Sequence, residues 1–153
     1  MRPAALVAGD GAPHQSVVVN ADAADATTAT LSVWHTGTGA APVLLFGPVP
    51  ARIGADGVGV LTEGQARTPE GVFALGSAFG LAPNPATRLP YFTVDDEDWW
   101  DGGPDSPTYN LHVRGDHAPA GSEHLADFPG QYDYAIDMGV NAARALVAFV
   151  GDE

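Results

Sequence analysis

Glycine and proline interrupt this chain every few residues, and no other feature constrains its fold as strongly. The 153 residues include 19 glycines and 13 prolines. Between these interruptions lie short runs that are apolar or that alternate apolar and polar residues. No window of about 11 residues carries the 3.6-residue period of an amphipathic helix. The sequence therefore predicts a mainly β fold built from short strands, with little helix.

Turn residues separate the predicted strands. β-branched and alternating apolar residues favour a strand in each run, and the spacing of the runs is typical of an antiparallel sandwich or barrel. One short helical turn is expected at residues 122–126 with Ser122 as its N-cap, and a tight turn at Asp56-Gly57. The predicted strands are residues 16–19, 28–34, 43–46, 57–61, 72–75, 91–94, 132–138 and 145–150.

The length of the chain fits a single domain with its own core. Residues 1–8 resemble the start of a secretory signal, but their apolar stretch ends at Gly9, short of the ~7–15 apolar residues that such a signal needs. We therefore expect residues 1–14 to be a disordered start or the remnant of a signal segment, and residues 15–153 to form the domain. No run reaches the ~20 apolar residues of a membrane-spanning helix, so membrane insertion is not expected.

The charge of the chain excludes some classes of partner. Nineteen acidic residues oppose six basic ones, all arginine and all scattered, for a net charge of -13. Nucleic acids and anionic membrane surfaces require clustered cations, so neither is an expected partner. A cationic or neutral ligand remains open, and the acids also keep a small domain soluble.

Two adjacent tryptophans, Trp99 and Trp100, interrupt an acidic stretch. Neighbouring residues of a strand point to opposite faces, so one indole is expected to pack inward while the other lies exposed. An exposed indole beside a groove makes a platform for a ligand. The surrounding acids lack the order of a calcium-binding EF-hand loop, and carboxylates that repel one another are expected to sit in water. These acids are Asp95, Asp96, Glu97, Asp98, Asp101 and Asp105.

A second polar group combines imidazoles and carboxylates that suit zinc. Its members fall within thirteen positions, but no pair has the His-Glu-x-x-His spacing of a metalloprotease. A polar surface loop is the preferred explanation, because loops gather such residues in any case. A metal-dependent hydrolase using His112, His117 and Glu123 stays open as the third functional hypothesis. The full group is His112, Asp116, His117, Glu123 and His124.

Other catalytic and cofactor motifs are missing from the chain. There is no cysteine, and Ser77 stands at the wrong place in its glycine-flanked segment to form a nucleophile elbow. The glycine-rich residues 54–59 lack the order of a dinucleotide-binding loop. No cofactor is therefore expected.

Several segments, read in order, match a known pattern. Residues 64–73 have the arrangement Gly-x-x-x-Thr-Pro-x-Gly-x-Phe, and the Trp-Trp and Tyr-Asn segments follow at matching positions. Together they resemble the L,D-transpeptidase catalytic domain of secreted actinobacterial proteins, over about residues 15–141. The segments that carry the resemblance are residues 47–54, 64–73, 78–80, 89–91, 99–100, 106–110, 122–125 and 132–135.

The resemblance implies a fold, a reaction and a location. The family's fold is a β-sandwich of mixed strands. Its members join peptidoglycan stem peptides: a cysteine activated by a histidine attacks an L,D peptide bond, and the acyl group passes to an amine of a second stem. The location implied is the cell envelope or the extracellular space.

The chain departs from the family after about Asn141. Residues 145–150 align with the end of the strand that carries the histidine, and Phe149 then stands at the histidine's position. No cysteine loop follows, so we expect a C-terminally incomplete, inactive L,D-transpeptidase-like domain of only marginal stability, in which residues 145–150 could act as a substitute strand. The alternative is a non-catalytic module that binds peptidoglycan peptides. Its expected contacts are Trp99, Trp100, Tyr109, Asn110 and Glu123.

Overall fold

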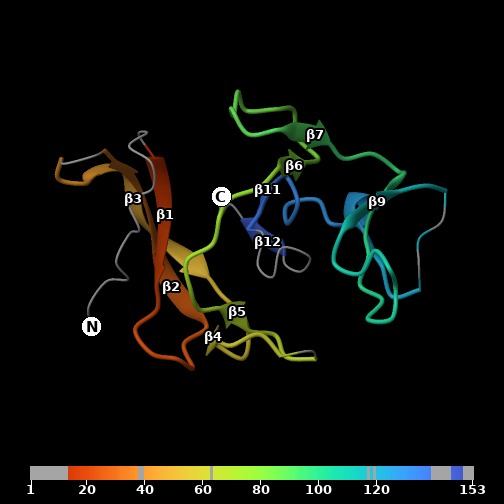
Figure 1. Cartoon of the computed structure of the whole chain (residues 1–153), viewed down its shortest axis with the longest axis horizontal. Helices are drawn as coiled ribbons and strands as arrows, with labels where there is room; N and C mark the ends of the chain where they lie inside the picture. The colour runs from red at the N-terminus through yellow and green to blue at the C-terminus, as the bar shows by residue number, and fades with distance from the viewer. Residues whose placement is uncertain are drawn as a thin grey trace. The chain divides into compact units, whose positions relative to one another are not determined.

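The computed structural model describes residues 14–37, 40–62, 64–116, 118, 120–138 and 146–149 (Figure 1). These residues form a mainly β structure of several small sheets with almost no helix. This confirms the prediction of a mainly β fold with little helix. The chain divides into two compact units, residues 1–72 and residues 73–153. The predicted disordered start at residues 1–14 lies outside the described residues, apart from His14 at the start of the first strand.

The first unit contains a three-stranded antiparallel sheet in the order β1-β2-β3. The β-branched residues of the first two strands lie opposite one another, with Val17 facing Val33, as expected for side chains that pack well on a pleated surface. A short parallel pair, β4 and β5, follows. The strands are β1 His14–Asn20, β2 Thr28–Thr36, β3 Val43–Arg52, β4 Val58–Gly59 and β5 Thr68–Pro69.

A tight turn precedes β4, as the Asp56-Gly57 pair predicts. The Gly57 amide donates to the Gly54 carbonyl at 2.9 Å, and Gly57 has a φ of 81°. L-residues other than glycine rarely adopt this conformation. A side chain at position 57 would also overlap the Ala24 carbonyl oxygen. Both the backbone angle and the close approach therefore require glycine here.

The second unit contains two small sheets. One has the order β12-β11-β6-β7, in which β6 and β7 run parallel and the other pairs antiparallel. The other places β8 between β9 and β10, all antiparallel. The strands are β6 Ala78–Gly80, β7 Tyr91–Thr93, β8 Asp98–Trp100, β9 His112–Arg114, β10 Glu123–His124, β11 Tyr134–Asp137 and β12 Leu146–Phe149.

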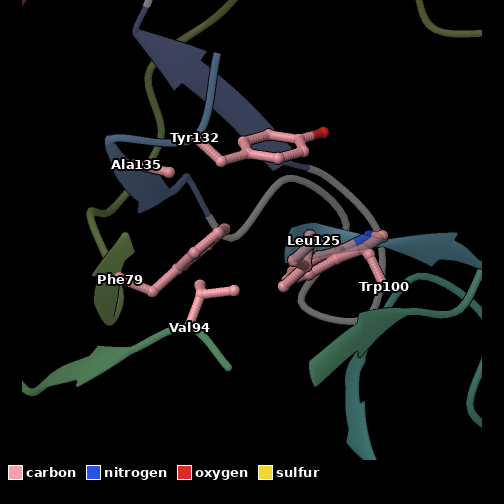
Figure 2. Close-up of a cluster of buried hydrophobic side chains, with 6 residues drawn as sticks. All are labelled: Phe79, Val94, Trp100, Leu125, Tyr132 and Ala135. Atoms are coloured by element: carbon pink, nitrogen blue, oxygen red, sulfur yellow. The ribbon is translucent and has the colours of Figure 1, made fainter. Parts of the chain in front are cut away.

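The hydrophobic core of the second unit gathers around Phe79 in β6 (Figure 2). Phe79 is 1% exposed, and its ring stacks on Phe92 at 5.1 Å and on Trp100 at 6.1 Å between centroids. Aromatic contacts of this kind add to the free energy gained by burying the rings. The buried cluster consists of Phe79, Val94, Trp100, Leu125, Tyr132 and Ala135.

Three expectations about local structure were wrong. Residues 72–75 form no strand, and Val72 is 63% exposed; among the described residues, no strand pairing includes this run. The helical turn expected at residues 122–126 is instead strand β10 followed by a 3₁₀ turn, Leu125–Asp127. His124 takes the N-cap position of that turn in place of Ser122, without a side-chain cap, because residues 123–124 pair with β8.

Within the part of the chain that the structure describes, no helix is long and apolar enough to span a bilayer.

Candidate functional site

The residues predicted to contact a ligand lie on or beside the β9-β8-β10 sheet. Trp99 and Trp100 belong to β8, and Glu123 begins β10. Tyr109 and Asn110 lie in the loop that joins β8 to β9. The structure therefore brings these five residues to one small sheet and its connecting loop.

The register of this sheet separates the two tryptophans. Trp100 lies opposite His112 on one side and Glu123 on the other, whereas Trp99 lies opposite Val113 and His124. Because directly paired residues share a face of a sheet and successive residues alternate, the two indoles occupy opposite faces.

Trp100 is the inward indole. It is 8% exposed and packs in the core, where its Nε1 donates to Asn110 Oδ1 at 2.7 Å. Asn110 has a φ of 60°, a left-handed conformation that asparagine tolerates better than most residues. The buried indole therefore fixes the end of the loop that carries Tyr109 and Asn110.

Asp101 organises the rest of this loop. Its carboxylate is fully buried and accepts hydrogen bonds from the Gly103 amide at 2.9 Å, from Thr108 Oγ1 at 2.6 Å and from Ser106 Oγ. Burial raises the pKa of Asp101, but hydrogen bonds from Ser106, Thr108 and Gly103 outweigh burial and leave the pKa below its usual value. The backbone of Asp101 also pairs with that of Asn110 and Leu111. The loop is thus held by a buried, ionised carboxylate.

An open hollow of about 410 Å³ is lined in part by this loop. Its lining is Gly103, Pro104, Asp105, Ser106 and Ala120. It borders the Asp101 network but holds none of the five residues predicted to contact a ligand.

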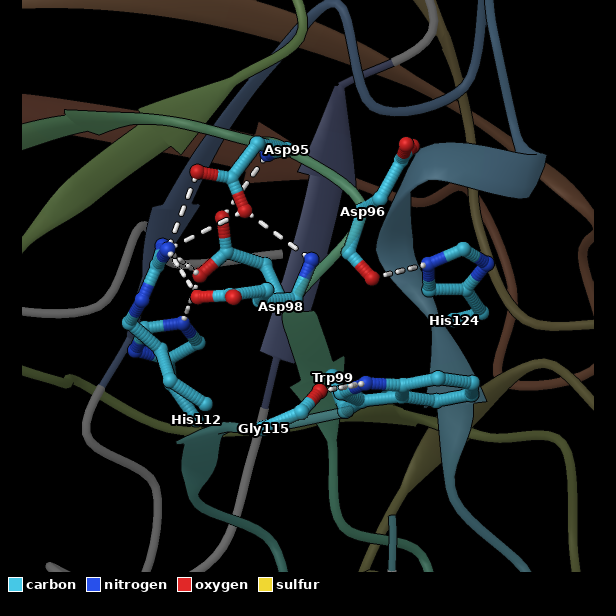
Figure 3. Close-up of polar contacts among 9 residues, drawn as sticks. Asp95, Asp96, Asp98, Trp99, His112, Gly115 and His124 are labelled. Carbon is cyan, nitrogen blue, oxygen red and sulfur yellow. Dashed lines mark hydrogen bonds and ion pairs between the residues drawn. The ribbon is translucent and has the colours of Figure 1, made fainter. Parts of the chain in front are cut away.

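Trp99 is the partly exposed indole on the opposite face. Its Nε1 donates to the Gly115 carbonyl at 3.0 Å, and its ring stacks on the His124 imidazole at a centroid distance of 4.2 Å (Figure 3). The prediction that one tryptophan packs inward is therefore confirmed. The outer indole is held in one orientation by two contacts.

The Glu123 carboxylate accepts a hydrogen bond from within the protein. Tyr132, which is buried in the core, donates its hydroxyl hydrogen to Glu123 Oε2 at 3.0 Å. Burial, together with the charge and the hydrogen bond of Glu123, raises the pKa of Tyr132 well above its usual value. The phenol therefore stays neutral and keeps donating to the carboxylate.

A second polar network, at Asp98, was not foreseen from the sequence. The Asp98 carboxylate is fully buried, and its Oδ1 lies 2.7 Å from both His112 Nε2 and Arg114 Nη1 (Figure 3). The His112 ring also stacks on Phe92 at 4.2 Å. The expectation that the whole acidic stretch sits in water was therefore wrong for Asp98 and Asp101, because local partners satisfy both buried carboxylates.

Arg114 gathers the exposed acids of the same turn. Its Nη2 lies 2.9 Å from Asp95 Oδ2 and 3.0 Å from Glu97 Oε2. The Glu97 amide and then the Arg114 guanidinium lower the pKa of Asp95. The hydrogen bonds that Arg114 donates to Asp95 and Glu97 raise the pKa of Arg114. The sequence carries no local signal for this network, because Arg114 lies sixteen residues after Asp98.

The described residues do not assemble the expected metal ligands. No group of three histidine, aspartate or glutamate side chains in that part of the chain could hold a metal ion. His112 and Glu123 lie on opposite sides of β8, about 10 Å apart at two strand spacings. They are bonded to Asp98 and Tyr132 respectively. His117 lies outside the described residues.

Phe149, expected at the position of the family's histidine, lies opposite Tyr134 in the pairing of β12 with β11. The backbone of residues 146–149 forms strand β12; that it substitutes for a strand of the family stays a prediction. The Phe149 side chain lies outside the described residues.

Comparison with known proteins finds no match for this chain among protein-family models, curated proteins or solved structures.

Proposed function

We propose that this chain is an L,D-transpeptidase-like domain, folded as a sandwich of mixed strands, whose 153 residues bind peptidoglycan stem peptides without performing acyl transfer. Its place would be the cell envelope or the extracellular space. The proposal rests on the motif resemblance and on how the structure packs the segments that carry it.

One observation carries the proposal. The core of the second unit draws on separate segments that bear the resemblance: Phe79 from residues 78–80, Trp100 from residues 99–100, and Leu125 from residues 122–125. Tyr132 and Ala135 come from residues 132–135. Residues as far apart in the sequence as Phe79 and Ala135 therefore pack as one cluster, as members of a single ancestral pattern would.

The proposal of peptide binding is supported by the hydrogen bonds and packing that fix the expected contact residues. The buried Asp101 and Trp100 fix the loop that bears Tyr109 and Asn110. Trp99 stays partly exposed at the neighbouring strand. A rigid scaffold that presents aromatic and amide side chains loses little conformational entropy when a ligand binds.

The absence of acyl transfer is supported by chemistry. The reaction requires a strong nucleophile, and the chain contains no thiol. The Ser106 hydroxyl donates its hydrogen to Asp101, whose lowered pKa makes that carboxylate a weak base for activating a hydroxyl. We also find no support for the metal-hydrolase hypothesis among the described side chains.

Binding can be tested on purified cell-wall sacculi. The chain is expected to co-sediment with them, whereas an unrelated protein of similar size and net charge is not. Adding a tetrapeptide stem is expected to shift the NMR signal of the Trp99 indole N–H and to leave that of Trp34, in the first unit, in place. Equal recovery of the chain and the control protein would refute binding.

Catalysis can be tested in the same samples. After incubation with tetrapeptide stems, mass spectrometry is expected to show no 3→3 cross-linked dimers above the level in buffer. Clear product would contradict the proposal that these residues act only by binding.

A further inference from the structure

The His124 imidazole stacks on Trp99, the outer indole of the proposed peptide site. We propose that His124 is a positioning residue: as a doubly protonated imidazolium it clamps Trp99, so that the orientation of this indole depends on pH. The effect on peptide binding rests on the proposed function, whereas the clamp itself does not.

Three contacts surround the His124 ring. Its face stacks on Trp99 with 4.2 Å between centroids and an interplanar angle of 27°. Its Nε2 lies 3.1 Å from the Asp96 carbonyl oxygen (Figure 3). Its Nδ1 lies 3.1 Å from Asp127 Oδ1. The ring therefore links the turn before β8, strand β8 itself and the 3₁₀ turn.

The partners decide where the protons lie. A carbonyl oxygen only accepts, so Nε2 must carry a hydrogen to bond Asp96. Asp127 is 68% exposed, and an exposed carboxylate is ionised near neutral pH. A bare Nδ1 would direct its lone pair at that anion. All three contacts are thus favourable together only when both ring nitrogens are protonated.

The charge of the ring also suits its stacking partner. A cation within about 6 Å of an indole centroid is attracted by the negative face of the ring, and tryptophan is the strongest such partner. The neutral imidazole would keep the stacking and one hydrogen bond, but would lose the ion pair and the cation–π attraction.

No positive charge among the described neighbours opposes this arrangement. From the turn before β8, Asp96 presents its carbonyl oxygen, and in Figure 3 its carboxylate points away from the ring. From the 3₁₀ turn comes Asp127, and from β9 the residue opposite Trp99 is the apolar Val113. Arg114, which also lies in β9, is engaged with Asp95, Glu97 and Asp98.

The clamp can be tested by NMR on the full chain between pH 5 and pH 8. The Trp99 indole N–H signal is expected to titrate together with the His124 ring signals. In Asp127→Asn, which removes an exposed charge, the common midpoint should move to lower pH. In His124→Gln, which can still donate to the Asp96 carbonyl, the Trp99 titration should disappear. His35→Gln, in the first unit, is the matched control and should change neither.

Each outcome bears on a distinct claim. A Trp99 signal that does not follow His124, or a midpoint unmoved by Asp127→Asn, overturns the clamp whatever the chain binds. If His124→Gln does not fold, the Asp127→Asn result alone decides. With the clamp present, recovery on sacculi at pH 6 should fall at least twofold in His124→Gln but not in His35→Gln. A working clamp without any binding would instead refute the proposed function.

Discussion

Asp101 shows how much one residue does in this protein. Its carboxylate is fully buried, yet it receives hydrogen bonds from three groups of its own loop and so remains ionised. A carboxylate only accepts hydrogen bonds, whereas an amide must also donate them. The charge at this position therefore stabilises the loop that bears Tyr109 and Asn110.

We predict that Asp101→Asn lowers the melting temperature by about 5 °C or more, because the amide nitrogen faces hydrogens where an acceptor is required. Asp105→Asn, at an exposed neighbouring position, is the matched control and should change it little. Thermal melts followed by circular dichroism measure both. Equal melting temperatures for the two variants would show that the buried network contributes nothing.

The same residue sets a pH dependence. The folded-state pKa of Asp101 lies below its value in the unfolded chain, about 3.9. Its stabilisation is therefore complete above that value and is lost as the pH falls toward the folded-state pKa. Asp95 acts in the same direction. Asp101→Asn should accordingly lose less stability than the wild type between pH 5 and pH 2.

At the scale of the element, the short strands are defined by what they pair with. Strands β8 and β10 contain three and two residues, too few to show a period of two in the sequence. Their pairing nevertheless decides that Trp100 enters the core while Trp99 meets His124. The prediction of a helical turn at residues 122–126 failed because a pairing partner outweighed a local N-cap signal.

Two glycines with positive φ, one in the turn before β4 and one after that strand, differ in the space around them. Gly57 and Gly64 both have positive φ, 81° and 78°. A side chain at position 57 would collide with the Ala24 backbone, whereas one at position 64 would meet nothing within 4 Å. Gly64→Ala should therefore cost only the backbone strain of about 1–2 kcal/mol, and Gly57→Ala should cost more.

Urea denaturation of both variants measures this difference in the free energy of unfolding. The comparison separates strain from steric overlap because only position 57 has both. If the two substitutions cost the same, the close approach of the turn to Ala24 does not constrain the folded chain.

At the scale of the whole molecule, the two units differ in how they bury apolar surface. Every buried apolar side chain among the described residues lies in the second unit. In the first unit, residues 43–46 of β3 are all exposed. Apolar burial is the main source of folding free energy, so the two units should not be equally stable.

We predict that amides of β1, β2 and β3 exchange with deuterium at least tenfold faster than those of β6 and β11, since segments with few buried contacts open at lower cost. Hydrogen exchange followed by mass spectrometry, on the intact chain, resolves these peptides. Equal or greater protection of the first unit would contradict the prediction. The marginal overall stability expected from the sequence stays a prediction.

Local chemistry in the sequence determined the mainly β character, the strands near residues 16–19, 28–34 and 91–94, and the turn at Asp56-Gly57. These features depend on neighbours within a few residues, through side-chain alternation and the freedom of glycine. The resemblance to L,D-transpeptidases is likewise carried by the order of short motifs, and the function it implies remains our proposal.

Only the tertiary structure decided which polar groups are buried and what each one meets. Asp98 lies among exposed acids in the sequence, yet it is buried because His112 and Arg114, fourteen and sixteen residues later, supply its hydrogen bonds. His124 meets Asp96 across twenty-eight residues. Partners so far apart leave no periodic signal, because burial of a charge depends on which strands come to lie side by side.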